Sequence, residues 1–564
     1  MRSHIFIIPD RFIPRLALVI LASATFCLAD STLVGTTMDS GGPLDPEQAA
    51  YDVHYYELRL TVDPADSTIA GSLLVQATAT ATLERLVLDL DNRLQVTAIT
   101  ASDSGDTLAF EHHQGRLAIN LGQTVPAGEP VAAMVHYRGR PLVAIMPPWT
   151  GGFSWDTTAT GDPWIAVSCQ GEGADIWWPN KDHPSDEPDS MGIIFTVPKP
   201  LTAVSNGCLR TVTDNGDGTH TFNWFVSTSI NKYNVTINAA PYRTIERDYL
   251  STSGDTIPFT YWVLPENYEQ GLAVVPEFLD HLRFMEETAG PYPFRADKYG
   301  VAEAPYLGME HQTIIAYGNK YRKDAFGIDK LHLHELAHEW WGNQVTARDY
   351  KDLWLHEGFA IYMEALYVER AQGDSALHAR MAGLRPRLTN IIPVAPRESH
   401  SMLQIYNLPP DYSRFNGDIY DKGGWVLHTL RYLIGDEAFF QALRRMTYPD
   451  PALEKVTDGR QTRFATTDDF QRIAEAAAGR DLGWFFDLYL RQPELPVLQI
   501  KRGRKKLTLK WKTPGRRPFP MPVEVAIGEK ILVLEMLKGR AKLKHSPGAA
   551  PVVDPDGWIL KEEK

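Results

Sequence analysis

The hydrophobic period of this chain changes twice, and this feature limits its fold more than any other. Between residues 51 and 250, short stretches such as Tyr56-Glu-Leu-Arg-Leu-Thr-Val62 alternate apolar and polar residues, and turns rich in Gly, Asn and Asp separate them. Alternation at period two indicates antiparallel strands. From about residue 265 to 490 apolar residues recur at helical spacing, and after Gln492 short strands return. The chain therefore divides into three segments with different secondary structure.

The length of 564 residues also exceeds what one hydrophobic core usually supports. We therefore predict a multidomain α+β protein with an N-terminal β-sandwich at residues 45–250. A mainly α domain follows at residues 251–492, and a small β domain at residues 493–564 ends the chain. Residues 30–44 are rich in Gly, Ser, Thr and Pro and are interpreted as a linker before the first domain.

The first 29 residues have the pattern of a secretory signal. Arg2, Arg11 and Arg15 precede an apolar run that extends from Leu16 to about Ala29 and contains several small residues. The run is short and closely flanked by charge, which disfavours a membrane span, although an uncleaved anchor is the alternative. We expect a secreted or periplasmic protein without stable membrane insertion after the signal peptide is removed.

Charge argues against nucleic acid as a partner. The formal net charge is −14, whereas phosphate binding needs Lys and Arg clustered on one face. The run from Lys501 to Lys512 is basic, but Leu507, Leu509 and Trp511 alternate with its polar residues as in a half-buried strand. We interpret this run as a solvated strand face.

The three cysteines are too few for a disulfide scaffold. Cys27 lies inside the predicted signal, which leaves Cys169 and Cys208. In an oxidising compartment these two could form one disulfide or remain free thiols, and the sequence leaves both options open.

One segment carries a metal-binding pattern. Leu331-His-Leu-His-Glu-Leu-Ala-His-Glu-Trp-Trp-Gly342 has a helical apolar rhythm, with Asp329 as the expected N-cap and Gly342 as the expected end. On a helix His334 and His338 lie one turn apart on the same side, where one zinc ion can bridge them. In this H-E-x-x-H pattern Glu335 acts as a base rather than a ligand. The alternative is that all three are ordinary helix residues.

A catalytic zinc site also needs a third protein ligand. Glu357 lies in Asp352-Leu-Trp-Leu-His-Glu-Gly-Phe-Ala-Ile-Tyr-Met-Glu364, a second helical stretch whose aromatic and aliphatic residues predict burial. An uncompensated buried carboxylate is costly, and a metal ion would compensate it. A surface carboxylate is the alternative interpretation of Glu357.

These motifs resemble those of the gluzincin zinc aminopeptidases, a family that includes aminopeptidase N and leukotriene hydrolase. The resemblance rests on His334-Glu-Leu-Ala-His338, on Glu357 within Trp354-Leu-His-Glu-Gly-Phe-Ala360, and on Trp341-Gly-Asn-Gln-Val345. It extends from about residue 45 to 564. It implies a thermolysin-like catalytic domain at residues 251–492 and one zinc ion per chain. The zinc ligands would be His334, His338 and Glu357, and the general base would be Glu335.

The resemblance also implies residues that bind the substrate. Tyr306-Leu-Gly-Met-Glu-His-Gln-Thr313 resembles the exopeptidase motif of the family, which places Gly308, Met309 and Glu310 against the substrate and assigns the free α-amino group to Glu310. This chain has His311 where the family usually has Asn.

Two further segments contribute to the implied cleft. Cys169-Gln-Gly-Glu-Gly-Ala174 resembles the part of the sandwich domain that contacts substrate through Gln170 and Glu172. Tyr420-Asp-Lys-Gly-Gly424 resembles the turn whose tyrosine donates a hydrogen bond to the oxyanion. Beside the metal, His356 also stands where relatives usually carry Asn.

The function that these resemblances imply is hydrolysis of the first peptide bond of peptides with a free N-terminus. Two carboxylates beside an ammonium group would reject a blocked N-terminus, because they would be desolvated without a cation. The alternatives are a zinc endopeptidase or epoxide hydrolase on the same fold, or a catalytically inactive binding protein. The oligomeric state is left open.

Overall fold

The computed structural model describes residues 39–102, 104–409, 412 and 415–563. The predicted signal at residues 1–29 and the first part of the predicted linker lie outside the described residues. In the part of the chain that is described, no helix combines the length and the apolar character needed to cross a bilayer.

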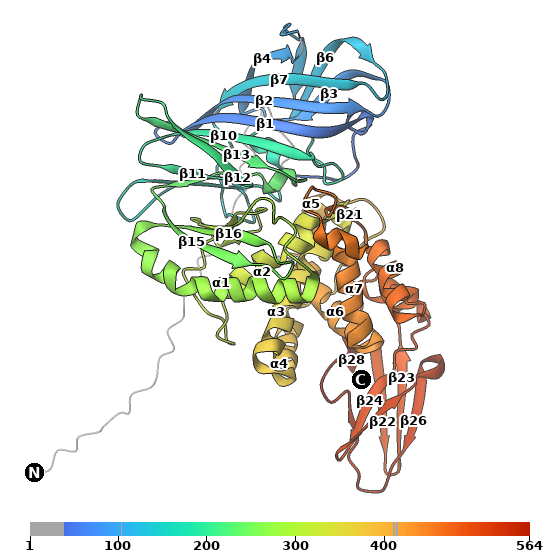
Figure 1. Ribbon diagram of the computed structural model, residues 1–564. Helices are drawn as coiled ribbons and strands as arrows, with labels where there is room; N and C mark the ends of the chain where they lie inside the picture. The colour runs from blue at the N-terminus through green and yellow to red at the C-terminus, as the bar shows by residue number, and fades with distance from the viewer. Residues whose placement is uncertain (1–38, 103, 410–411, 413–414, 564) are drawn as a thin grey trace, which may run out of the picture. The chain divides into compact units, whose positions relative to one another are not determined.

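The N-terminal domain is built on a seven-stranded sheet with the strand order β12-β13-β10-β1-β2-β7-β4 (Figure 1). β1 pairs antiparallel with β2 and parallel with β10. Buried and exposed residues alternate along β7, which is the origin of the period-two sequence pattern. The strands are β1 Tyr51–Asp63, β2 Thr68–Ala79, β4 Leu94–Ala101, β7 Pro130–Gly139, β10 Ser190–Pro198, β12 Cys208–Asp214 and β13 Thr219–Val226.

Two smaller sheets complete this domain, and they share one hydrophobic core with the large sheet. One has the order β3-β6-β5 and the other β11-β14-β9-β8. Their strands are β3 Leu83–Asp89, β5 Phe110–His113, β6 Arg116–Val125, β8 Gly152–Thr157, β9 Pro163–Ser168, β11 Thr202–Val204 and β14 Asn238–Ala240. The predicted β-rich N-terminal domain is confirmed, and the end of β9 leads directly into Cys169 and Gln170.

The catalytic region begins with a sheet of its own, in the order β15-β16-β17-β19-β18. Its strands are β15 Arg243–Leu250, β16 Thr256–Val263, β17 Tyr299–Glu303, β18 Gly308–Met309 and β19 Ile315–Tyr317. β15 pairs with β16, so the predicted boundary at residue 250 falls inside a hairpin. Alternation alone did not show which sheet β15 would join.

Helices form most of the remainder of this domain. They are α1 Tyr268–Ala289, α2 Lys330–Ala337, α3 Trp354–Gln372, α4 Asp374–Leu384, α5 Met402–Tyr406, α6 Asp421–Ile434, α7 Asp436–Thr447, α8 Thr467–Ala478 and α9 Gly483–Tyr489. α1 is followed by Gly290, whose φ of 113° lies in the region that favours glycine. α8 begins with a capping box formed by Thr466 and Asp469. A parallel pair, β20 Val345–Ala347 and β21 Arg463–Ala465, joins two distant segments.

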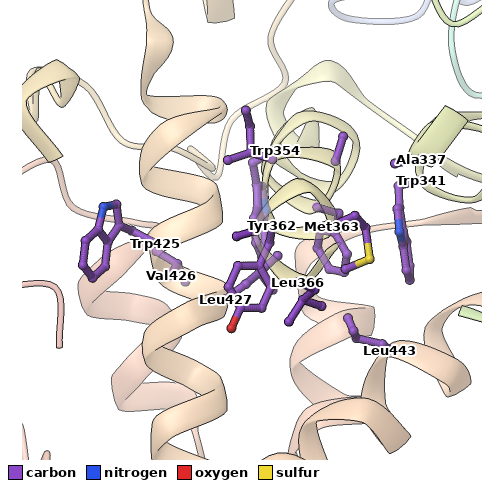
Figure 2. Packing of buried hydrophobic residues seen from close by; sticks show 14 of the residues in the cluster. Ala337, Trp341, Trp354, Tyr362, Met363, Leu366, Trp425, Val426, Leu427 and Leu443 are labelled. Carbon is purple, nitrogen blue, oxygen red and sulfur yellow. The ribbon is translucent and has the colours of Figure 1, made fainter. Parts of the chain in front are cut away.

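The helix α3 is buried in the middle of this domain (Figure 2). Its Trp354, Tyr362 and Met363 lie between residues of α6, such as Leu427, and Trp341, which follows α2. Fifteen consecutive residues of α3, Trp354 to Val368, are buried. A helix buried on all sides needs apolar residues all round, which explains the dense aromatic and aliphatic sequence of this segment.

Two glycines allow α3 and α6 to approach closely. A β-carbon built on Gly358 would lie 2.8 Å from the Cα of Gly423, and one on Gly423 would lie 2.8 Å from the Cα of Gly358. No side chain fits at such a distance. The helix that carries Glu357 is therefore held against the helix that begins after Tyr420.

The C-terminal segment forms two small sheets, β26-β23-β22-β28 and β25-β24-β27. Their strands are β22 Val497–Gly503, β23 Lys506–Lys512, β24 Val523–Ile527, β25 Lys530–Leu534, β26 Arg540–Lys544, β27 Val552–Val553 and β28 Glu562–Glu563. In β23 the side chains of Leu507, Leu509 and Trp511 are buried while its lysines are exposed. This confirms the predicted strand with a solvated basic face.

Candidate active site

The two histidines of the metal-binding pattern lie at the end of α2. Asp329 accepts a hydrogen bond from the backbone N–H of His332 and caps the helix, as predicted. The regular α-helix ends at Ala337, and the wider turn that follows loses helical backbone angles at Trp341 and at Gly342, where the helix was predicted to end. One turn of helix still separates His334 from His338, so both imidazoles face the same side.

The structure brings both histidines to Glu357 of α3. The Nε2 atoms of His334 and His338 are 3.3 Å apart, and they lie 3.4 and 3.5 Å from Oε2 of Glu357. Ligands about 2.0–2.1 Å from a tetrahedral zinc ion are separated by about 3.4 Å. The three predicted ligand atoms are thus spaced for one zinc ion.

Hydrogen bonds settle which nitrogen of each histidine carries the proton. Nδ1 of His334 lies 2.8 Å from Oε1 of Glu364, and Nδ1 of His338 lies 2.9 Å from the carbonyl oxygen of Trp341. Both partners are acceptors, so each Nδ1 donates, and in the neutral imidazole each Nε2 keeps a free lone pair. Two lone pairs and a carboxylate oxygen then face one another, and Oε2 of the buried Glu357 has no hydrogen-bond donor. A divalent cation would satisfy all three atoms.

The electrostatics of the pocket favour positive charge. Burial opposes ionisation of both histidines, but Glu357 and Glu364 outweigh it at His334 and raise its pKa to about 10. Burial also opposes ionisation of His338, but the negative charges of Glu357 and Glu310 outweigh it and raise the pKa of His338 to about 9. A cavity that stabilises imidazolium in this way also attracts a metal cation, which would replace the proton at each Nε2 when it binds.

Glu364 is a functional residue that sequence reasoning missed. Burial opposes its ionisation, yet Lys330, Arg380 and His334 together lower its pKa to about 2, so it is a carboxylate that orients His334. Carboxylates that accept from metal-bound histidines fix their tautomer and raise their basicity. The sequence spacing could have identified Glu364, because it follows Glu357 by two helical turns and therefore lies on the same face of α3.

Glu335 lies beside the three ligand atoms and is 7% exposed. Burial is the main cause that raises its pKa to about 8. A β-carbon on Gly308 would come within 2.8 Å of its Oε1, so the glycine of the predicted exopeptidase motif leaves room for this carboxylate. Oxygen atoms of Glu335 and Glu310 and a ring nitrogen of His338 lie within 4.8 Å of one another. The candidate base is therefore close both to the metal ligand His338 and to Glu310.

Two further carboxylates, Glu310 and Glu172, are buried, and Gln170, two residues before Glu172, contacts Glu310. Glu310 accepts hydrogen bonds from Nε2 of Gln170, at 2.6 Å, and from the hydroxyl of Tyr233, at 3.2 Å. Glu172 accepts from the backbone N–H of Gly151 at 2.8 Å, and its Oε2 has no partner.

In the described part of the chain, lysine and arginine do not compensate these two charges, although a ring nitrogen of His338 lies within 4.8 Å of Glu310. Among the residues that the structure describes, Lys and Arg form no ion pair with Glu310 or Glu172. Burial raises the pKa of both groups. A ligand with a positive charge would therefore compensate these two buried carboxylates.

Tyr420 lies immediately before α6, and its ring is stacked 6.2 Å from that of His334. Its hydroxyl is 3.0 Å from the hydroxyl of Tyr406. Sequence reasoning did not identify Tyr406 or Tyr233. Met309, the remaining predicted contact, is buried in β18.

The two histidines that replace asparagine are both buried. His356 accepts a hydrogen bond at Nε2 from the backbone N–H of Ala347 at 2.8 Å, and burial lowers its pKa to about 3. His311 is fully buried, and burial lowers its pKa to about 3 as well. Both side chains are neutral, so neither changes the charge of the site.

The structure has no disulfide between Cys169 and Cys208, a bond that the sequence had left open. Cys169 and Cys208 are free thiols. The thiol of Cys169 lies 3.6 Å from the carbonyl oxygen of Tyr233, whereas that of Cys208 lies 3.0 Å from the carbonyl oxygen of Asp297.

Comparison with known proteins agrees with this geometry. Two parts of the chain match descriptions of one family: residues 52–233 match the "Peptidase M1 N-terminal domain" and residues 282–489 the "Peptidase family M1 domain". Among curated relatives, glutamyl aminopeptidase of Homo sapiens is 28% identical over 346 residues, which are 58% of this chain and 34% of the relative. Aminopeptidase N of Streptomyces lividans is 27% identical over 332 residues, 56% of this chain and 37% of the relative. The chain spans about a third to a half of the length of the curated relatives it matches.

Solved structures extend the similarity across both large domains. The M1 zinc metallopeptidase from Deinococcus radiodurans has a TM-score of 0.62 and 25% identity, covering 79% of this chain and 94% of its own. Aminopeptidase A of Legionella pneumophila has the same fold, with a TM-score of 0.71 at 16% identity over 91% of this chain and 60% of its own. The fold, the paired domain matches and the spacing of the metal ligands agree, and the chain belongs to peptidase family M1.

Proposed function

We propose that this protein is a zinc aminopeptidase that hydrolyses the first peptide bond of peptides with a free N-terminus. The observation that carries the proposal is the position of Glu310, a buried carboxylate that no Lys or Arg of the described residues pairs with, within 4.8 Å of Glu335 and of the metal ligand His338. A substrate ammonium group supplies the missing charge. When the ammonium group is bound there, the first peptide bond is the one nearest the metal position.

The residues present fit zinc. His334 and His338 offer neutral Nε2 atoms, Glu357 offers an unpartnered oxygen, and their spacing suits a tetrahedral ion. When bound to these ligands, zinc supplies Lewis acidity, which acidifies water and polarises a carbonyl group.

Glu335 transfers the protons of the reaction. Its carboxylate removes a proton from the attacking water as the water oxygen bonds to the scissile carbonyl carbon. It then delivers that proton to the amide nitrogen as the C–N bond breaks, which leaves a free amino acid and a shortened peptide. The Tyr420 hydroxyl donates a hydrogen bond to the developing oxyanion.

Glu310, Glu172 and Gln170 set the register of the substrate. The two carboxylates accept hydrogen bonds from the ammonium group, while Gln170 holds Glu310 through its amide N–H. A substrate with an acetylated N-terminus would leave both carboxylates buried and unpaired. This cost disfavours the endopeptidase alternative.

Hydrolysis of paired substrates tests the proposal. We expect purified protein to cleave free aminoacyl-naphthylamides but not their N-acetylated counterparts, and to lose this activity with a chelator and in Glu335→Gln. Equal cleavage of acetylated substrates would favour the endopeptidase, and turnover of an epoxide alone would favour the epoxide hydrolase. No turnover of any substrate by zinc-loaded protein would favour the inactive binding protein.

We also propose that the protein is secreted or periplasmic. The support is the predicted signal at residues 1–29, where arginines precede an apolar run. Cell fractionation followed by N-terminal sequencing tests this proposal. Cytoplasmic protein that retains Met1 would contradict it, and membrane-bound protein that retains it would favour the uncleaved anchor.

A further inference from the structure

The hydroxyl of Tyr406 lies where the metal ligands approach the residues around Glu310. It is 3.0 Å from the hydroxyl of Tyr420, 3.3 Å from Oε1 of Gln170 and 3.5 Å from Oε1 of Glu357. One phenolic hydroxyl thus connects the oxyanion donor, the sandwich residue that holds Glu310, and the third metal ligand.

We propose that Tyr406 is a positioning residue that directs the hydroxyl proton of Tyr420 towards the scissile carbonyl. This inference rests on the proposed aminopeptidase function and adds to it a residue outside the matched motifs. A phenolic hydroxyl carries one proton and can donate only one hydrogen bond at a time. Of the three oxygens near Tyr406, that of Tyr420 is closest.

The role of Tyr420 determines which of the two hydroxyls donates the hydrogen bond to the other. If Tyr420 donated to Tyr406, its only proton would be used within the protein and none would be left for the oxyanion. When Tyr406 donates instead, the Tyr420 oxygen is the acceptor and its own proton is free to point into the cleft. Hydrogen bonds in a chain polarise one another, so a hydroxyl that accepts also donates more strongly.

The geometry of Tyr406 is fixed by the short helix that carries it. Ser401 and Gln404 form a capping box at the start of α5. Asp39 adds two further contacts, accepting from the Ser401 hydroxyl at 2.6 Å and from the backbone N–H of Leu403 at 2.8 Å.

The same N-terminal residues tie α5 to the sandwich. The carbonyl oxygen of Ser40 accepts from the backbone N–H of Met402, while its own N–H donates to the carbonyl oxygen of Gly171. Gly171 lies between Gln170 and Glu172. Residues 39–44 were expected to be part of a linker, but residues 39 and 40 connect α5 with the turn that carries the predicted substrate contacts.

The experiment compares kcat and KM on a free aminoacyl-naphthylamide for four zinc-loaded proteins: wild type, Tyr406→Phe, Tyr420→Phe and the double variant. Losing a neutral hydrogen bond that acts only in the transition state should lower kcat of Tyr406→Phe by about 3- to 10-fold, with KM nearly unchanged. Tyr420→Phe should lower kcat by about 100-fold. Adding Tyr406→Phe to it should have no further effect, because the hydroxyl that it positions is already absent.

Tyr412→Phe is the matched control, because Tyr412 lies six residues away on an exposed part of the same segment. Its kcat should equal that of the wild type, and zinc content and thermal midpoint should agree among all variants. A wild-type kcat in Tyr406→Phe would overturn the inference. So would an equal loss in both backgrounds, a rise in KM alone, or loss of zinc from Tyr406→Phe. Inactive wild-type protein would instead contradict the aminopeptidase function itself.

Discussion

The metal end and the amine end of the cleft are assembled in different ways. The ligands His334, His338 and Glu357 come from two neighbouring helices within 24 residues of sequence. The amine end joins Glu310 of the catalytic domain to Gln170 and Glu172 of the sandwich, and 140 residues separate Gln170 from Glu310. The metal end therefore depends on helix packing inside one domain. The amine end depends on how two domains meet, so changes at the two ends should have separable effects.

The largest expected effect is at the metal end. His338→Ala removes one of three ligands, and the variant should lose zinc and fall below about one ten-thousandth of wild-type activity on every substrate, because Lewis acidity is lost with the ion. Metal analysis and hydrolysis rates measure this. His545→Ala, at an exposed position far along the chain, serves as the control. Substantial activity in His338→Ala would refute the assignment of the metal ligands.

An effect of intermediate size is expected at the amine end. Glu310→Gln keeps the shape but removes the charge that holds the ammonium group, so kcat/KM for free substrates should fall by about 100-fold, as expected for loss of a buried charge pair. Zinc content should stay at one ion per chain. Loss of zinc as well would show that the two ends are not separable.

A smaller effect on metal affinity is expected from Glu364→Gln. An amide oxygen accepts more weakly from Nδ1 of His334, so zinc affinity should fall by about 10- to 100-fold. At saturating zinc, kcat should return close to the wild-type value. Competition with a chelator of known affinity measures the change, and Glu369→Gln on the same helix is the control. Unchanged affinity would mean that Glu364 does not support the metal ligand.

The smallest expected effect concerns stability. Gly423→Ala places a β-carbon against α3, which should lower the free energy of unfolding by about 1–3 kcal/mol, as overpacking does. Gly383→Ala in α4 is the matched control, since its β-carbon meets no atom within 4 Å. Thermal unfolding of both variants distinguishes them. An equally stable Gly423→Ala would show that α3 and α6 separate easily.

The metal end was largely predictable from sequence because its information is local. Helical spacing predicted that His334 and His338 share a side, and an apolar helix predicted the burial of Glu357. The same periodicity could have identified Glu364. Periodicity could not indicate which carboxylate accepts a hydrogen bond from which histidine.

The amine end was less predictable because its contacts span long separations. Tyr233 and Glu310 are 77 residues apart, and Tyr406 and Gln170 are 236 apart. Neither tyrosine lies in a pattern with a chemical meaning, so only the fold shows their role. The boundary at residue 250 was misplaced for a related reason, because the sequence of β15 does not indicate that it pairs with β16.

The glycine contact between α3 and α6 has a consequence for altering specificity. With Gly358 and Gly423 in contact, the separation between Glu357 and Tyr420 is a fixed dimension of the protein. A larger or smaller substrate pocket must therefore be made elsewhere, in the turn around Gly171 or in α5. Engineering for a new N-terminal residue should leave the helix pair unchanged and keep Gln170, Glu172 and Tyr406 within those two segments.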